Sequence, residues 1–367
     1  MIDFLRFPMI IGVLLIHNAS ATVQTASGPV GSQAFLPIHS FCTDLFSQTL
    51  GRLAVPTFFF ISGFLFFLHL ERFNLATYRK KLPSRVKTLL IPYLFWNLLS
   101  VTVFSLAHYV PAFSRFFSKS YELTWQYVLQ ALWAIPDLNQ TSHMAYPYAY
   151  QFWFIRDLMV MVMLTPVIYC FVKKLRLWGL GLLGILWFSE WWQALFPWLA
   201  GHGLSITALF FFTAGAWFSL NQRNVVDDAQ KVAKWTFALY PLFAMADMLT
   251  KIHVPKQHVY LPFIHNSGIL FGMAASFALA AWLLKTGRAR VNAFLASASF
   301  FVFAVHDPWF LSKLRKAIWV LFRPESDIAL TALYFLLVIV VTATALALYW
   351  LLRRFLPGFT RVITGGR

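Results

Sequence analysis

Ten long apolar stretches alternate with short polar segments along the 367-residue chain. Each is close to the roughly 20 residues that a helix needs to cross the hydrocarbon layer of a membrane. In lipid such stretches must be helices, because an open strand would leave backbone groups without hydrogen bonds. The pattern predicts an all-α, polytopic membrane bundle of about ten transmembrane helices, forming a single domain over 1–367 with no fused soluble domain. The predicted spans are 4–20, 51–70, 88–109, 151–172, 177–195, 204–221, 235–251, 264–285, 293–312 and 328–352.

The distribution of Lys and Arg predicts that both termini are cytoplasmic. With the N-terminus inside, 20 of the 30 basic residues fall in inner segments and 8 in outer ones, while Arg52 and Arg156 lie near outer helix ends. Basic residues collect on the cytoplasmic side of membrane proteins. The outer segment 313–327 is more basic than this rule favours, and a helix lying in the membrane interface, with Trp319 on its apolar side, would account for it.

Composition supports lipid as the surrounding solvent. Hydrophobic residues make up 59% of the chain and charged residues 12%, whereas soluble domains carry about 25% charged residues. The net charge of +17 would suit a nucleic-acid partner in a soluble protein. Here the basic residues sit in short loops between apolar runs, so we expect no nucleic acid.

Two smaller features are also interpreted from the pattern. Cys42 and Cys170 fall on opposite sides of the predicted topology, so we expect neither a disulfide nor a metal site. Ala19-Ser20-Ala21 resembles a signal-peptidase site after the first apolar run. Against cleavage there, that run carries Asp3 and His17, and its removal would leave nine spans.

The first predicted helix carries ionisable residues, which are costly in a membrane and usually functional. From Arg6 to His17 is eleven residues, about 16 Å of helical rise and almost three turns, so the two share a face, with Asp3 close to it. Arg6 lies at the cytoplasmic end and His17 deep, towards the outer side. The alternatives are that Arg6 extends to the interface and that His17 makes an ordinary buried hydrogen bond.

A second set of ionisable residues falls at outer depth in later spans. Arg156 and Asp157 lie one or two turns into the fourth run, which begins at Gln151, and each needs its own partner because adjacent helical positions do not face each other. An ion-pair network between helices is the structural alternative to a catalytic site. Trp153 could line a pocket or belong to the outer aromatic belt. The further candidates at this depth are Glu190, Asp247, His306 and Asp307.

The densest basic cluster, Arg79 to Lys87, faces the predicted cytoplasm. Clustered Lys and Arg suit phosphate oxygens, so this loop could form a phosphate-binding rim. Topology and anionic lipid would explain it equally well. Ser62 and Gly63, inside the second span, are interpreted as permitting close helix approach.

These residues, taken in order, resemble the membrane acyltransferase-3 family, especially its surface-polysaccharide O-acyltransferase branch. The resemblance covers almost the whole chain, and the ordered set is more specific than any one piece. The matching pieces are Ile2-Asp3-Phe4-Leu5-Arg6 with His17 eleven residues after the Arg, Phe59 to Phe64, the basic run into Lys87 to Tyr93, Phe95-Trp96-Asn97, Phe152 to Leu158 and Ser299 to His306.

The resemblance implies an acyl-CoA-dependent O-acyltransferase. It implies acyl-CoA, usually acetyl-CoA, as co-substrate, no bound cofactor, and a hydroxyl of a surface glycan or its lipid-linked precursor as acceptor. It carries His17 over as the catalytic histidine and Arg6 as its motif partner. Glycan-assembly proteins are possible partners, and the bacterial cytoplasmic (inner) membrane is the expected location.

Within this expectation, the residues suggest a mechanism. We expect the phosphates of CoA to bind Arg6, Arg79, Lys81 and Arg85, and the thioester to lie near His17. Arg156 would hold the acceptor or stabilise an oxyanion, with Asp157 orienting it or His17. General-base and covalent acyl-histidine routes both remain open. The alternative function is a transporter or flippase of a glycan or lipid intermediate, although no internal repeat is visible.

Overall fold

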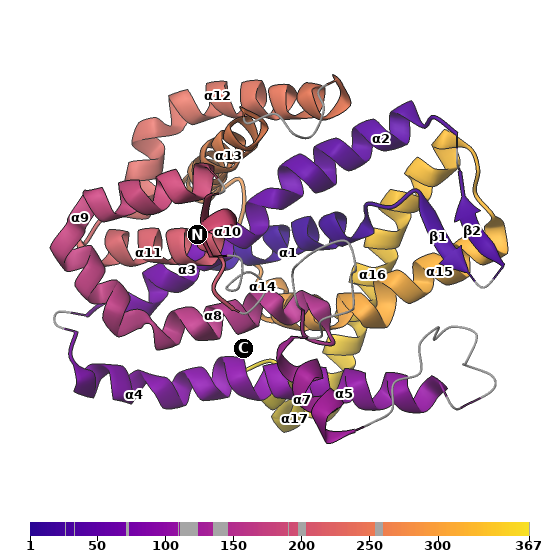
Figure 1. Cartoon of the computed structure of the whole chain (residues 1–367), viewed down its shortest axis with the longest axis horizontal. Helices are drawn as coiled ribbons and strands as arrows, with labels where there is room; N and C mark the ends of the chain where they lie inside the picture. Colours follow the sequence, from indigo (N-terminus) through magenta and orange to yellow (C-terminus); the bar gives the residue numbers. More distant parts are fainter. Residues whose placement is uncertain are drawn as a thin grey trace. The chain divides into compact units, whose positions relative to one another are not determined.

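The computed structural model describes residues 1–25, 27–32, 34–70, 73–108, 110, 124–134, 146–189, 191–196, 203–253 and 260–366 (Figure 1). Every predicted apolar run contains helix within these limits. The helices that correspond to the ten runs are α1 (Ile2–Asn18), α3 (Ala54–Phe67), α5 (Ile91–His108), α8 (Trp153–Met163), α9 (Thr165–Phe188), α11 (Ile206–Leu220), α12 (Val225–His253), α13 (Tyr260–Lys285), α14 (Ala293–Val305) and α16 (Asp327–Phe355).

Shorter elements connect these helices. The fold is helical as predicted, apart from one small element that was not predicted, in which β1 (Thr22–Thr25) pairs antiparallel with β2 (Gly28–Gly31). Gly28, at the end of the turn between the strands, has a positive φ value, which glycine adopts without strain. The other connecting helices are α2 (Pro37–Thr43), α4 (Leu75–Arg85), α7 (Trp125–Trp133), α10 (Trp191–Leu195), α15 (Leu311–Phe322) and α17 (Pro357–Ile363), with irregular turns η1 (Asp44–Leu50), η2 (Gly51–Leu53), η3 (Val86–Leu90), η4 (Tyr150–Phe152) and η6 (His306–Phe310).

Five helical segments among the described residues are long and apolar enough to cross a membrane, or six if a bent pair counts as one span. The bent pair is α8 with α9, at 65°. The fold is therefore helical with several candidate membrane spans, fewer than the ten expected. Helix α1 has 17 residues and α11 has 15, below the length of a full span. Helix α12 has 29 residues but carries many charges.

The predicted boundary between the fourth and fifth spans lies inside α9. The chain leaves helical geometry at Arg176, with φ 50° and ψ −130°. This is the last residue of the loop expected at 173–176. The two apolar runs are thus joined by a sharp break at one residue, and no extended loop separates them.

The chain divides into two compact units. The first contains Met1–Ile16, Asp44–Pro83 and Asp157–Ser299. Within it α3 and α11 meet at backbone distance, because a Cβ on Gly63 would lie 2.0 Å from the Phe212 carbonyl oxygen. A Cβ on Gly215 would lie equally close to the Phe60 oxygen. The close-approach role predicted for Gly63 is confirmed.

The second unit contains His17–Thr43, Ser84–Arg156 and Phe300–Arg367. The Asp327 carboxylate at the start of α16 accepts hydrogen bonds from the Ile38 and His39 backbone N–H groups of α2. Trp319 on α15 is buried against Leu36 and Leu330. A helix does occupy the segment predicted to lie in the interface, but its tryptophan packs inward and does not face lipid.

Candidate functional site

The hydroxyl of Tyr150 bridges His17 and Asp307 in the second unit. It lies 3.0 Å from His17 Nδ1 and 2.6 Å from Asp307 Oδ2. His17 comes from the last turn of α1, Tyr150 opens η4, and Asp307 lies in η6 after α14. The His17 and Tyr150 rings also meet edge to face, with centroids 5.1 Å apart. Three segments that are distant in the sequence thus form one connected group.

The bridge determines which nitrogen of His17 carries a proton. Tyr150 has a single hydroxyl proton, and its 2.6 Å contact with Asp307 has the length of a charge-assisted O–H···O⁻ hydrogen bond. Since the proton is donated there, the Tyr150 oxygen accepts from Nδ1–H of His17. The lone pair of a neutral His17 is therefore on Nε2, the nitrogen with the character of a base or nucleophile.

Asp307 is held in place by its neighbours in the chain and by η4. Its backbone is extended (φ −147°, ψ 146°), which interrupts the helix between α14 and α15. Oδ2 also accepts a hydrogen bond from Ser312 at 2.9 Å, and Gln151 donates to the Asp307 backbone oxygen. Oδ1 is buried and has no hydrogen-bond partner within the described part of the chain. One oxygen is thus occupied in holding Tyr150, and the other is available to a ligand.

His306 lies beside His17, with ring centroids 5.3 Å apart. It is fully buried, and its Nδ1 is 2.6 Å from the Phe303 carbonyl oxygen. A carbonyl only accepts, so Nδ1 donates and the lone pair of a neutral His306 is on Nε2. Among the described residues that nitrogen has no hydrogen-bond partner. The candidate site therefore contains two imidazoles, each with Nε2 left as the acceptor.

The end of α1 is fixed by two contacts from later helices. The guanidinium of Arg315 donates to the backbone oxygen of His17 at 3.2 Å. The side chain of Asn18 donates to the Tyr334 backbone oxygen at 2.6 Å. The last carbonyls of a helix have no partner within it, so a donor from α15 both satisfies one and fixes the position of His17.

The other predicted outer-depth residues have the following surroundings. Arg156 is buried, donates to the Trp133 carbonyl at 2.8 Å and stacks on the Trp133 ring. Asp157 is buried on α8, where Trp153 is the first residue. Asp247 belongs to the first unit and contacts Lys251 at 2.6 Å and His265 at 3.0 Å, which is the ion-pair network named as the structural alternative. Glu190 lies outside the described residues.

The predicted donor-binding residues occupy different environments. Arg6 forms an ion pair with Asp3 at 2.7 Å on α1. Lys81 on α4 donates to the Phe66 carbonyl and lies over the Phe66 ring, so it packs against α3. Arg79 is exposed on the same helix, and Arg85 at its end is half-buried. Arg6 also lines a cavity.

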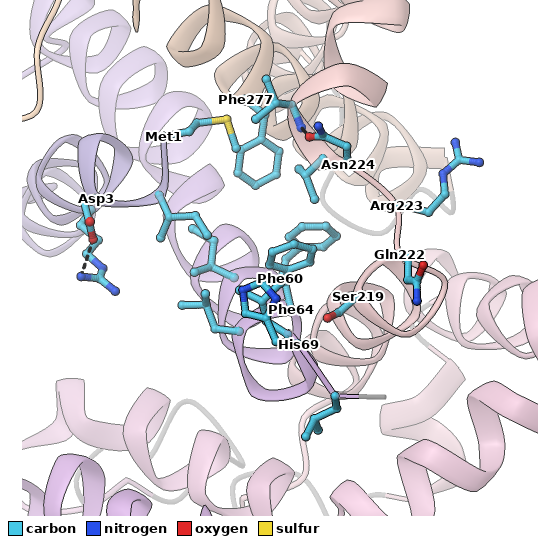
Figure 2. A pocket seen from close by; sticks show the side chains of 18 residues that line it. Met1, Asp3, Phe60, Phe64, His69, Ser219, Gln222, Arg223, Asn224 and Phe277 are labelled. Carbon is cyan, nitrogen blue, oxygen red and sulfur yellow. Dashed lines mark hydrogen bonds and ion pairs between the residues drawn. The ribbon is translucent and has the colours of Figure 1, made fainter. Parts of the chain in front are cut away.

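The cavity lies in the first unit and has a volume of about 960 Å³. Figure 2 shows Phe60, Phe64 and Phe277 in its interior, with Asp3 on one side and Arg223 on the other. Arg6, Ser219 and Gln222 also line it. Pockets for small molecules have volumes of roughly 300–1,000 Å³ and combine apolar walls with a few polar groups. Elsewhere, no group of three or more His, Cys, Asp or Glu side chains among the described residues could hold a metal ion.

Comparison with known proteins identifies the family. Residues 1–354 match the acyltransferase-3 family, described as an acyltransferase domain. The chain belongs to the acyltransferase-3 family. This acyltransferase-3 chain is 25% identical over 383 residues to the succinoglycan biosynthesis protein ExoH of Rhizobium meliloti (strain 1021), covering 100% of this chain and 92% of the relative. No solved structure matches it.

The acyltransferase-3 motifs account for part of the site. His17 and His306 belong to segments in which the resemblance was visible in the sequence. Tyr150, Ser312 and Arg315 were missed, although each contacts His17 or Asp307. Tyr150 lies just outside the fourth predicted span, which begins at Gln151. A tyrosine at the end of a span is typical of the aromatic belt at the membrane interface, so it does not indicate a functional site. In the sequence, Arg315 stands out only as one of the basic residues that make the outer segment 313–327 more basic than expected for that side of the membrane.

Proposed function

We propose that the protein is a multi-pass O-acyltransferase of the bacterial cytoplasmic membrane. It transfers an acyl group, acetyl in the simplest case, from cytoplasmic acyl-CoA to a hydroxyl of a surface polysaccharide or its lipid-linked precursor. The observation that carries the proposal is the Asp307–Tyr150–His17 chain of hydrogen bonds in a member of the acyltransferase-3 family. The relative named for succinoglycan biosynthesis supports a polysaccharide acceptor.

In the proposed reaction, His17 Nε2 takes the proton of the acceptor hydroxyl as its oxygen attacks the thioester carbonyl carbon. The C–S bond then breaks, and the CoA sulfur leaves with the proton carried by His17. Asp307, through Tyr150, favours the imidazolium that forms between the two steps. In the covalent route the same Nε2 attacks the thioester carbonyl carbon, the C–S bond breaks and CoA leaves as the thiolate. The acceptor oxygen then attacks the acyl-imidazole, the N–acyl bond breaks, and the hydroxyl proton goes to the thiolate. Either route uses the tautomer that the bridge imposes.

Several residues are assigned supporting roles in this proposal. The donor phosphates bind Arg6, Arg79 and Arg85 on the cytoplasmic side, and the pantetheine arm follows α1, on which Arg6 and His17 are about 16 Å apart along the helix. Lys81 joins them if its contact with the Phe66 carbonyl opens. His306 and the free oxygen of Asp307 orient the acceptor hydroxyl. Arg156 and Asp157 remain assigned to acceptor binding and charge stabilisation, with Trp153 and Glu190 as secondary residues.

The test is His17→Gln in purified protein with labelled acetyl-CoA and crude glycan. Glutamine keeps a hydrogen-bonding group of moderate size, so the variant is expected to insert, fold and bind CoA. Turnover should fall by at least about 10²-fold because the base or nucleophile is gone. Monodispersity, CoA-induced thermal shift and turnover are measured on one preparation.

Two results would overturn the proposal. Normal turnover per folded His17→Gln molecule removes His17 from the mechanism. Movement of the glycan across the membrane without consumption of acetyl-CoA identifies a transporter. Acid quenching during turnover and mass spectrometry of the peptide containing His17 then distinguish the two chemical routes, since only the covalent one leaves an acylated histidine.

A further inference from the structure

Two arginines from different segments of the first unit flank the cavity described above. Arg6 comes from α1, and Arg223 from the turn between α11 and α12. Both side chains are partly exposed, Arg6 by 34% and Arg223 by 49%. Both belong to segments that the sequence assigns to the cytoplasmic side. The rings of Phe60, Phe64 and Phe277 lie between Asp3, the ion-pair partner of Arg6, and Arg223 (Figure 2).

A second observation indicates that the cavity receives a ligand. The Ser219 hydroxyl lines it, is buried, and has no hydrogen-bond partner among the residues described. A buried hydroxyl without a partner costs about 1–3 kcal/mol, so such groups commonly await water or a ligand. Aromatic walls, a hydroxyl and two flanking guanidiniums together suit a molecule with a flat apolar part and phosphate groups.

Each of the two arginines forms an ion pair with a carboxylate. Asp3 pairs with Arg6 at 2.7 Å, and Asp228 pairs with Arg223 at 2.7 Å. Asp228 does not line the cavity, and the hydrogen bond from Arg223 lowers the pKa of the Asp228 carboxyl. A phosphate in the cavity would therefore compete with Asp228 for Arg223. Exposed ion pairs of this kind contribute little to stability, so exchange of partners is inexpensive.

We infer that this cavity binds the phosphorylated adenosine end of the acyl-CoA donor, with Arg223 as a phosphate ligand opposite Arg6 and Phe60 and Phe277 against the adenine. The inference rests on the proposed function and adds to the donor set a residue far from α4. An anionic phospholipid offers the same combination of phosphate and apolar body. The experiment therefore includes an arm for each source.

The test measures CoA binding by titration calorimetry, with the full chain in nanodiscs of phosphatidylcholine. Arg223→Gln should weaken CoA binding at least about tenfold, as expected for loss of a charged hydrogen bond. Asp228→Asn removes the carboxylate that competes with the phosphate for Arg223, so this change should tighten CoA binding. The matched control is Arg288→Gln, which removes an equal charge from the turn after α13, where Arg288 stacks on Trp282 outside the cavity.

Opposite signs for the Arg223 and Asp228 variants, with no effect of Arg288→Gln, support the site. Equal CoA affinity in wild type and Arg223→Gln overturns it, while turnover that still depends on His17 leaves the proposed function intact. In the lipid arm, thermal stabilisation by phosphatidylglycerol is compared in the same proteins. If Arg223→Gln abolishes that stabilisation and leaves CoA binding unchanged, the phosphate belongs to a lipid and the donor assignment is wrong.

Discussion

The tyrosine between His17 and Asp307 separates this group from a simple pair of histidine and carboxylate. A direct pair would place the carboxylate charge against the imidazole, whereas here a neutral hydroxyl relays it. Asp307 keeps one oxygen without a hydrogen-bond partner in the described structure. A single carboxylate can therefore fix the histidine tautomer through one oxygen and contact a substrate hydroxyl with the other.

Replacing Tyr150 with Phe tests this relay, because it keeps the ring and removes the bridging hydroxyl. We expect kcat to fall about 10–100-fold, matching the roughly 1.5–3 kcal/mol that hydrogen bonds to charged groups contribute. The KM for acyl-CoA should stay unchanged, since Tyr150 makes no contact in the donor cavity. Steady-state kinetics with acetyl-CoA, with a thermal shift on the same protein, measures both quantities.

Tyr240→Phe is the matched control for that prediction. The Tyr240 hydroxyl is also buried but has no hydrogen-bond partner within the described ranges, so its removal should leave kcat unaltered. If the relay acts as one unit, Tyr150→Phe combined with Asp307→Asn should cost no more than the more damaging single change. Additive losses, or wild-type kcat in Tyr150→Phe, would contradict the relay.

At the residue scale, the sequence predicts the family's histidine but not its surroundings. His17 stands out because a titratable residue in an apolar run is costly. Tyr150 carries no such signal, since tyrosine is common at membrane surfaces. Its bond to Asp307 joins positions 157 apart, and no local pattern encodes that meeting. Asp307 was noted for its charge, while its extended backbone was not predicted.

At the scale of elements, the crossing of α3 and α11 depends on two glycines. Gly63 faces the Phe212 carbonyl, and Gly215 faces the Phe60 carbonyl, each leaving no room for a Cβ. Without a hydrophobic driving force between helices in lipid, such close packing is a main source of association. This element-level contact was predictable for Gly63, because a small residue inside an apolar run has few other roles.

Gly63→Ala should therefore lower thermal stability in detergent, by an amount in the roughly 1–3 kcal/mol range of overpacked substitutions. Phe60 borders both this crossing and the cavity, so CoA affinity should fall as well. The control is Gly181→Ala on α9, where a Cβ would meet nothing within 4 Å. That change should instead stabilise, because alanine is a better helix former than glycine. Equal melting temperatures for Gly63→Ala and wild type would contradict the close-packed crossing.

At the scale of the whole molecule, helix positions were predictable and the number of crossings was not. Periodicity locates an apolar run, but a run of 17 residues such as α1 gives only about 26 Å of rise, short of the roughly 30 Å hydrocarbon core. The hairpin of β1 and β2 was also missed, because its strands are only four residues long and show no regular alternation of polar and apolar residues. The orientation of the chain stays a prediction from its basic residues.

Topology can be tested with single cysteines placed at exposed loop positions in a chain with Cys42 and Cys170 changed to Ser. Ser27→Cys, on the hairpin, should react with an impermeant thiol reagent applied to intact cells. Arg290→Cys, after α13, should react only once the membrane is opened. Both residues are exposed, so burial does not confuse the result. The reverse labelling pattern would place the donor cavity on the wrong side for cytoplasmic acyl-CoA.

The spread of the relay along the chain has a consequence for biosynthesis. His17 leaves the ribosome before Asp307 and Ser312, which follow about 290 residues later in the chain. At about 5–20 residues per second, roughly 15–60 s separate them. During that interval the nascent chain carries an imidazole whose tautomer is not yet fixed. Under the proposed function, a growing chain should not consume acyl-CoA, and activity should arise only after the segment that carries Asp307 and Ser312 has entered the membrane.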